Sequence, residues 1–211
     1  MNKLNRLIRD RGFVASLRFI GSRFFRVQQH MVFEHDLSNV PSVDWPLGVE
    51  VVPLITAQDV TSEIYAELVN LASDNTDYLN DIKRGSCIGL VVRQDNKIVH
   101  FAFVMRGSRM LCLLGLPSNA ALLGNAYTLP EFRGRGYQTR SITQRIKLAS
   151  QQNFIIAYSE TAPDNYTSQR CIKRGGMLFK GSIILIVIMN IFVIRWRSSY
   201  KAPTFSICTG Q

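Results

Sequence analysis

Cysteine and histidine are scarce in this 211-residue sequence, and the spacing of the few that occur argues against several kinds of site. His30 and His35 are five residues apart, which turns their side chains off a common helix face. The cysteines lie far apart with no CxxC pair, a pattern typical of reduced intracellular thiols rather than of a disulfide framework or a zinc site: Cys87, Cys112, Cys171 and Cys208. We therefore expect reduced cysteines and no metal site.

Long hydrophobic runs are also absent. The most apolar segment, residues 183–196, contains Asn190 and is shorter than the roughly 20 residues that span a bilayer as a helix. Because Ile and Val dominate this segment, we predict a single buried strand from Ile183 to Trp196. The sequence has neither GxxxxGK[ST] nor a GxGxxG after its first predicted strand, so two common phosphate-binding loops are excluded.

The net charge of +10 is concentrated near the start of the chain. Residues 1–30 contain a single acid, Asp10, and apolar residues recur among their basic ones at helical spacing, which predicts a basic amphipathic arm rather than a secretory signal. Three interpretations are open: a helix that covers one edge of the domain, a helix on an anionic membrane, or contact with nucleic acid. The basic residues are Lys3, Arg6, Arg9, Arg11, Arg18, Arg23 and Arg26.

The rest of the chain predicts one α/β domain. Pro41, Pro46 and Gly48 mark a break, so we divide the chain into an N-terminal arm (1–48), a domain (49–200) and a C-terminal tail (201–211). Turn residues and apolar periodicity predict strands at 49–54, 87–93, 97–106, 121–129 and 154–158 before the strand at 183. Helices are predicted at 57–72, 136–152 and 164–174. This order predicts a mixed sheet with helices on its faces.

The segment 126–138 is the most informative part of the sequence. A predicted strand ends at Leu129, a glycine-containing loop follows, and a long helix begins near Gly136. The first turn of a helix has unpaired N–H groups and partial positive charge, so this turn suits an anion and a pyrophosphate in particular. A tight turn with solvated arginines is the alternative. The loop consists of Arg133, Gly134, Arg135, Gly136, Tyr137 and Gln138.

In these residues the chain resembles the GNAT superfamily of N-acetyltransferases. That family has Q/R-x-x-G-x-G/A between a strand and its central helix, and Arg133–Gly136 match the first four positions, with Gln138 in place of the usual small residue. A second region, an Asn-x-x-Ser/Ala helix followed by glycine, is matched by Asn165, Ser168 and Gly176. The resemblance covers residues 49–196 and is strongest over 122–180.

The resemblance implies an α/β (α+β) fold with a mixed, mostly antiparallel sheet, helices on both faces and two central strands that separate. The gap would admit the pantetheine arm of acetyl-CoA, the expected cosubstrate, whose amides would pair with the backbone of Tyr127, Thr128 and Leu129. Loop residues 133–138 would bind the pyrophosphate, and Asn165 and Ser168 belong to the same cofactor site. The acceptor amine would then attack the thioester directly.

The general acid and base are less well defined. In many members of this family a tyrosine seven residues after the helix asparagine acts as the general acid, but here that position is Ile172. Glu160 is the first candidate base, with an ordinary loop carboxylate as the alternative. Tyr127 and Tyr158 are candidate acids, with packing as the alternative. The carboxylates of Asp74, Asp77 and Asp81 would share a helix face, which predicts a solvated acidic face or cap and only weakly an acceptor site.

The sequence therefore predicts an acyl-CoA-dependent N-acetyltransferase acting on a small or a lipid- or nucleotide-linked amine. We expect no specific nucleic acid partner and a cytoplasmic location, with peripheral contact to an anionic membrane through residues 1–30 left open. Two alternatives remain: a catalytically silent acyl-CoA-binding protein of this fold, and a basic module that binds membranes or nucleic acid without a cofactor.

Overall fold

The computed structural model describes residues 25–189, 191–197 and 202–208. Most of the predicted basic arm, residues 1–24, lies outside the described residues. The helices are α3 (Ser62–Leu71), α4 (Asn75–Lys83), α5 (Arg109–Leu114), α6 (Tyr137–Gln151) and α7 (Tyr166–Arg174), with short 3-10 turns η1 (Ala57–Asp59) and η2 (Pro130–Phe132). The strands are β1 (Phe25–Asp36), β2 (Val49–Leu54), β3 (Cys87–Gln94), β4 (Lys97–Arg106), β5 (Ala121–Thr128), β6 (Ile156–Thr161), β7 (Leu178–Ile188), β8 (Phe192–Arg197) and β9 (Thr204–Ile207).

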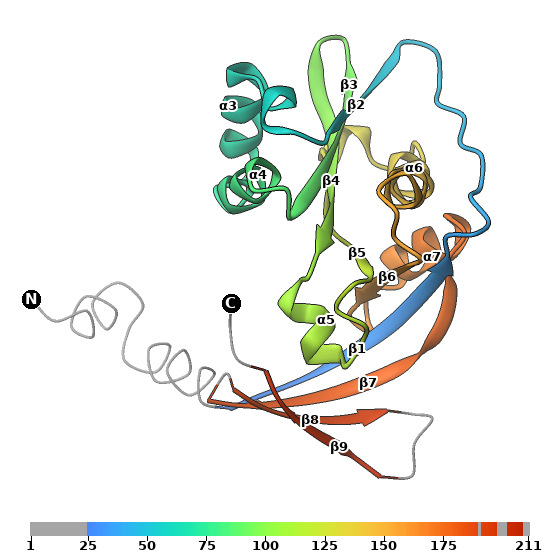
Figure 1. Cartoon of the computed structure of the whole chain (residues 1–211). Helices are drawn as coiled ribbons and strands as arrows, with labels where there is room; N and C mark the ends of the chain where they lie inside the picture. The colour runs from blue at the N-terminus through green and yellow to red at the C-terminus, as the bar shows by residue number, and fades with distance from the viewer. Residues whose placement is uncertain (1–24, 190, 198–201, 209–211) are drawn as a thin grey trace, which may run out of the picture.

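These strands form one sheet in the order β2-β3-β4-β5-β6-β1-β7-β8-β9. Neighbours are antiparallel except β5 and β6, which are parallel. Helices α6 and α7 pack on one face, while α3 and α4 cover the β2–β4 part of the other face and α5 covers part of its β5–β8 region (Figure 1). The predicted mixed, mostly antiparallel α/β fold is confirmed.

Local sequence signals predicted several of these elements well. β2 has the predicted bounds, and β3 and β4 form the predicted hairpin, in which Asp95 and Asn96 both have positive φ (52° and 60°), as a tight turn requires. Helix α6 buries Ile142, Ile146 and Ala149, the apolar face expected from its period, against the core. No helix in the described part of the chain is long and apolar enough to cross a membrane.

Strand β1 is the largest departure from the sequence-based expectation. Residues 25–36, which we assigned to the N-terminal arm, lie inside the sheet between β6 and β7. Their basic and polar residues continue the pattern of the arm, whereas the strand is stabilised by pairing with segments far along the chain. Val32 and Phe33 are buried there, so the sheet of the domain begins before residue 49.

The predicted strand from Ile183 to Trp196 is two strands. The chain reverses after Ile188, where Met189 has a φ of 52° and the N–H of Ile191 donates to the Ile188 carbonyl (3.1 Å). β7 and β8 therefore pair with each other, Ile183 opposite Arg197. Part of the predicted C-terminal tail forms β9, which pairs with β8.

The cysteine prediction was wrong for one pair. Cys112 in α5 and Cys208 after β9 form a disulfide with a Cα–Cα distance of 6.2 Å and a sequence separation of 96. The two residues meet only because β7, β8 and β9 fold back beneath α5, and sequence spacing carries no sign of that contact. Cys87 and Cys171 are free thiols, and burial raises the pKa of Cys87 to about 12.

Candidate active site

Strands β5 and β6 lie side by side only briefly. Their parallel pairs run from Ala121 with Ala157 to Leu123 with Ser159. No further pair joins them in the described part of the chain, although both strands continue. The end of β5 still pairs with β4 on its other side. The predicted separation of the two central strands is thus present, and it leaves one edge of β5 without a strand partner within the described ranges.

Arg145 of α6 is bound to the backbone where β5 leaves β6. Its guanidinium is buried and donates from Nη1 to the carbonyls of Phe103 (3.1 Å) and Gly124 (3.2 Å), and from Nε to Ser141 (3.3 Å). Burial lowers the Arg145 pKa to about 9. These bonds hold β4 and β5 beside a register shift in their pairing. Sequence reasoning missed Arg145, because a lone arginine on an amphipathic helix is usually a surface residue.

The loop that follows β5 brings two glycines to the start of α6. Gly134 and Gly136 have φ values of 78° and 81°, in the left-handed region that favours glycine. A Cβ at Gly136 would also lie 2.6 Å from Nη1 of Arg140. Among the described residues, no group accepts a hydrogen bond from the N–H groups of residues 134–139. This is the unpaired helix start that the sequence predicted.

Arginine side chains fix the shape of this loop. Arg133 Nε donates to the Thr128 carbonyl (3.2 Å), and Arg135 Nη2 donates to that of Glu131 (3.3 Å). Arg140 joins the loop to the segment before β2, because Nη1 donates to the Arg135 carbonyl (3.0 Å) and Nε to a carbonyl at residue 44 (2.9 Å). These bonds use carbonyl oxygens and leave the N–H groups of the turn available, beside three positive charges.

Two of the predicted loop residues differ in exposure. Tyr137 is buried, stacks on Trp45 and donates its hydroxyl to Gln94 Oε1 (2.7 Å), so its side chain belongs to the core. Gln138 is half-buried in the first turn of α6. Tyr137 can therefore contribute only its backbone N–H to a bound anion.

Asn165 and Ser168 lie together at the start of α7, the helix after β6. Asn165 is the N-cap, and its Oδ1 accepts a hydrogen bond from the Ser168 N–H (3.1 Å). Capping explains why Asn165 occurs here. Ile172, seven residues after Asn165, is buried in the core, so no hydroxyl reaches the site from that position.

Glu160 lies on β6 just past its last pair with β5, and it has a partner that sequence reasoning missed. His30 of β1 places Nδ1 2.6 Å from Oε2 of Glu160. The His30 side chain is 11% exposed and that of Glu160 is 27% exposed, and both residues line a cavity of about 550 Å³. The other residues lining the cavity are Gln28, Gln29, Thr161, Ala162 and Pro163. No sequence signal indicated this pair, because β1 itself was not predicted.

The two candidate tyrosines lie in different surroundings. Tyr127 is 38% exposed near the end of β5, with the Arg133 guanidinium 5.7 Å from its ring centre. Tyr158 is buried, and burial raises the pKa of its hydroxyl. Lys180, which pairs with Glu34, lies 5.6 Å from the centre of the Tyr158 ring.

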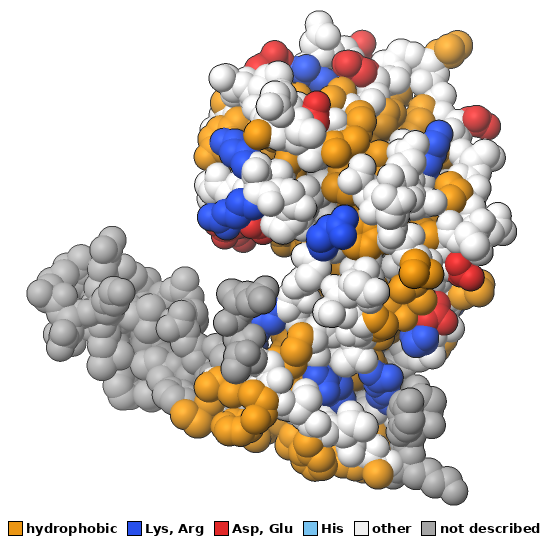
Figure 2. All heavy atoms as spheres, in the orientation of Figure 1, with side chains coloured by type: hydrophobic (Ala, Val, Ile, Leu, Met, Phe, Trp, Pro, Cys, Tyr) orange, Lys and Arg blue, Asp and Glu red, His pale blue; other side chains and the backbone are white. Residues whose placement is uncertain are grey.

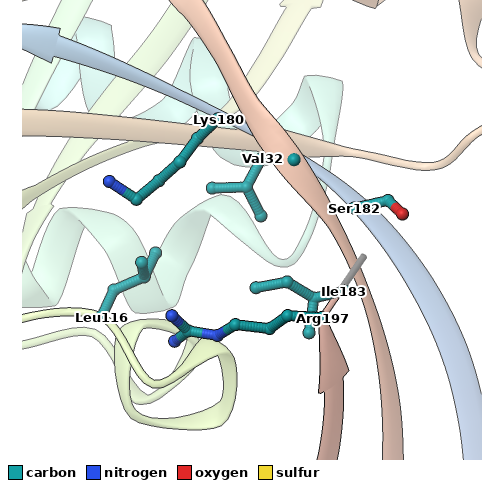
Figure 3. A pocket seen from close by; sticks show the side chains of 7 residues that line it. Val32, Leu116, Lys180, Ser182, Ile183 and Arg197 are labelled. Atoms are coloured by element: carbon teal, nitrogen blue, oxygen red, sulfur yellow. The ribbon is translucent and has the colours of Figure 1, made fainter. Parts of the chain in front are cut away.

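Lys180 also lines a second, smaller cavity of about 130 Å³. In Figure 3, Lys180 and Arg197 extend toward the same side of this cavity, with Val32 and Leu116 between them. Arg197 donates to the carbonyls at Leu114 and Gly115 (3.0 and 2.6 Å). This cavity belongs to the packing between β7, β8 and α5, and not to the loop at α6.

The three aspartates around α4 lie at its start and along its exposed side. Asp74 is the N-cap residue, Asp77 is in the first turn, and Asp81 pairs with Arg84 (3.3 Å). Carboxylates at a helix start are stabilised by the helix dipole. The Asp74 side chain makes no capping hydrogen bond, so this arrangement agrees with the predicted solvated acidic face. No cluster of three or more potential metal ligands occurs among the residues that the structure describes.

Comparisons with known proteins agree with this geometry. The sequence profile of the acetyltransferase (GNAT) family matches residues 57–177. No curated protein matches the sequence. An acetyltransferase of the GNAT family from Colwellia psychrerythraea is similar in structure, with a TM-score of 0.55, 16% identity and coverage of 82% of this chain and 61% of its own.

Two further solved structures show the same fold. A GCN5-related N-acetyltransferase from Sphaerobacter thermophilus has a TM-score of 0.53 and 15% identity, and the match covers 88% of this chain and 57% of its own. A GNAT-family protein from Novosphingobium aromaticivorans has a TM-score of 0.52 and 20% identity, and the match covers 75% of this chain and 63% of its own. This chain thus spans less than two thirds of the length of these structures.

Proposed function

The chain belongs to the GNAT family of acetyltransferases, and from that premise we propose that it transfers an acyl group from acetyl-CoA to a primary amine. The observation that carries the proposal is the start of α6, where the N–H groups of residues 134–139 have no acceptor within the described ranges and two glycines open the backbone. A pyrophosphate is the ligand that this arrangement suits best, because several N–H groups and three arginines converge there.

The separated strands support a site for the rest of the cofactor. We place the pantetheine arm along the edge of Tyr127, Thr128 and Leu129, where its amides would pair with β5 as an added strand does. Asn165 and Ser168 begin the helix that follows β6, the strand parallel to β5, and we assign them to the same cofactor site. Backbone N–H groups at the separation would then face the thioester carbonyl and stabilise its developing negative charge.

Glu160 is our proposed general base, and His30 positions it. The 2.6 Å contact uses Oε2 of Glu160 and leaves Oε1 for a proton taken from the amine, directly or through water. His30 is mostly buried in the sheet and also lines the cavity, so its ring would fix the carboxylate from beside the substrate. The adjoining cavity would hold the acceptor amine.

Tyr127 is our proposed acid for the departing thiolate. Its ring is partly exposed beside the proposed path of the pantetheine arm. Tyr158, the other candidate, is enclosed between β1, β7 and α5, where its hydroxyl has no access to a leaving group. We therefore retain Glu160 and Tyr127 and assign Tyr158 a packing role.

Substitution of Gly136 by glutamate tests the cofactor site. A carboxylate about 4 Å from a phosphate near the surface costs about 4 kcal/mol, so we expect CoA affinity measured by calorimetry to fall at least about 100-fold. Gly107→Glu is the control for a glutamate at positive φ, since Gly107 has a φ of 61°, has open space around it and lies away from the loop. Unchanged affinity in Gly136→Glu would refute the assignment of the loop.

Substitution of Glu160 by glutamine tests the chemistry. With acetyl-CoA and a panel of small and lipid- or nucleotide-linked amines, we expect thiol release to fall by about 100-fold while CoA affinity is unchanged. Glu131→Gln is the control, because Glu131 is an exposed carboxylate near the loop that pairs with Lys97. Equal rates in both variants would contradict the role of Glu160.

A catalytically silent protein of this fold is the second candidate, favoured by the buried Ile172 at the position of the usual tyrosine. It would bind CoA without releasing thiol with any amine in the panel. A cytoplasmic location and contact with an anionic membrane remain part of the proposal, and the membrane contact rests on the charge of residues 1–30. Equal recovery of the full chain in the supernatant, with and without anionic liposomes, would exclude that contact.

A further inference from the structure

One face of the sheet carries rows of apolar side chains that no described element covers. Cross-strand pairs in β1, β7, β8 and β9 align these side chains. One row is Phe25, Ile188, Phe192 and Ile207, the next is Val27, Ile186, Ile194 and Phe205, and a third pairs Ile184 with Trp196. We call these ten residues the outer apolar face. Figure 2 shows hydrophobic side chains gathered along the lower edge of the molecule, where Figure 1 places β7, β8 and β9.

The outer apolar face is unusually large for an exposed surface. Its four aromatic side chains are about half exposed or more: Phe25 56%, Phe192 49%, Trp196 55% and Phe205 71%. They alone leave on the order of 400 Å² of apolar surface in water, which reaches the size of the largest patch on a typical monomer before any Ile or Val is added.

The composition of β7 agrees with a sheet that is covered on both faces. Residues 183–188 are all apolar, and a continuous apolar run is typical of strands buried on both sides. Ile183, Leu185 and Val187 point inward and are buried under α5, whereas the alternate residues belong to the outer apolar face. The second layer is therefore a segment outside the described residues or another molecule.

We propose that residues 1–24 of the same chain cover the outer apolar face. Phe13, Leu17, Ile20 and Phe24 recur at i, i+4, i+7 and i+11, which on a helix forms one apolar stripe about 18 Å long. Four strands at a spacing of about 4.8 Å present a face of comparable width. The stripe and the face both lack charged residues, so the basic side chains of the segment would face solvent.

The covalent connection favours this segment over other partners. Phe24 is joined directly to Phe25, which belongs to the first row of the face. A tethered segment is present at its site at an effective concentration on the order of millimolar. A second copy of the chain or a lipid surface would have to compete with that local concentration.

Trp196 provides a direct test. The sequence has two tryptophans, so Trp45→Phe leaves Trp196 as the single fluorophore within the outer apolar face. In the full-length Trp45→Phe variant we expect acrylamide to quench Trp196 weakly. Deletion of residues 2–24, or Leu17→Asp with Ile20→Asp, should raise the quenching constant at least threefold. Ala15→Asp with Ser22→Asp adds the same charge on the opposite side of the stripe and should leave quenching unchanged.

If a second copy of the chain or a lipid surface covers the outer apolar face instead, the quenching experiment gives a different result. Shielding of Trp196 that disappears on dilution, together with a dimer in sedimentation velocity, would overturn the proposal in favour of a second copy. Shielding that requires anionic vesicles would overturn it in favour of a lipid surface. Strong quenching in the unaltered full chain, or equal quenching in the two aspartate pairs, would also refute it. None of these results depends on CoA binding, so they are independent of the proposed acyl transfer.

Discussion

Acid should weaken this fold through His100, a fully buried residue of β4. Its Nδ1 lies 2.7 Å from the Thr128 hydroxyl, and burial lowers the His100 pKa from 6.5 to about 3, with repulsion from Arg145 as a smaller cause. The folded protein therefore keeps His100 neutral, whereas the unfolded chain takes up a proton as the pH falls below 6.5. The stability that this difference supplies is complete above pH 6.5 and is lost progressively toward pH 3.

The expected loss in the free energy of unfolding at pH 5 follows from the difference between the folded and unfolded pKa of His100. The pH is then about 1.5 units below the unfolded pKa, and each unit corresponds to about 1.4 kcal/mol, so protonation of the unfolded state costs the fold about 2 kcal/mol. Urea unfolding followed by circular dichroism at pH 7.5 and pH 5 would measure it. The pKa values of Asp36, Asp59 and Glu131 are also lowered, but the stability that these carboxylates supply is lost mainly below pH 5, outside the measured range.

His100→Asn is the informative comparison, because it retains a polar group near Nδ1 and removes the titration. We expect the variant to be less stable at both pH values, because the smaller side chain leaves a cavity. The free energy of unfolding should nevertheless fall by about 2 kcal/mol less in His100→Asn than in the wild type between the two pH values. Parallel losses in the two proteins would refute the reasoning.

Two other perturbations test the framework of the site. Arg145→Met leaves the carbonyls of Phe103 and Gly124 without their donor and should cost about 3 kcal/mol in urea unfolding; a variant as stable as the wild type would show that the carbonyls find other donors. Reduction of the Cys112–Cys208 disulfide should cost about 2–4 kcal/mol and lower the melting temperature. Cys112→Ser should not respond to the reductant, and a wild type that does not respond either would argue against the bond.

The sequence predicted those features of the fold that short stretches of chain determine. The hairpin at Asp95 and Asn96, the apolar face of α6 and the glycine turn before it each depend on a few neighbouring residues. Strand β1 depends instead on partners far along the chain, and its alternation is obscured by the basic arm that precedes it.

The candidate site likewise contains residues that the sequence predicts and residues that only the structure reveals. The loop before α6 has a recognisable spacing, and the cap at Asn165 has another, so both could be read from the sequence. Arg145 and His30 are single residues whose importance comes only from burial and from what they contact. The disulfide likewise joins two cysteines that no sequence spacing relates.

The central place of β1 constrains how the sheet can be completed. This strand is translated long before the residues that flank it in β6 and β7, as the separation of 130 residues between His30 and Glu160 illustrates. Until they emerge, Val32 and Phe33 have no sheet to enter. Contacts of such long range slow folding, so closure of the sheet, and with it the positioning of Glu160, must wait until β7 has left the ribosome.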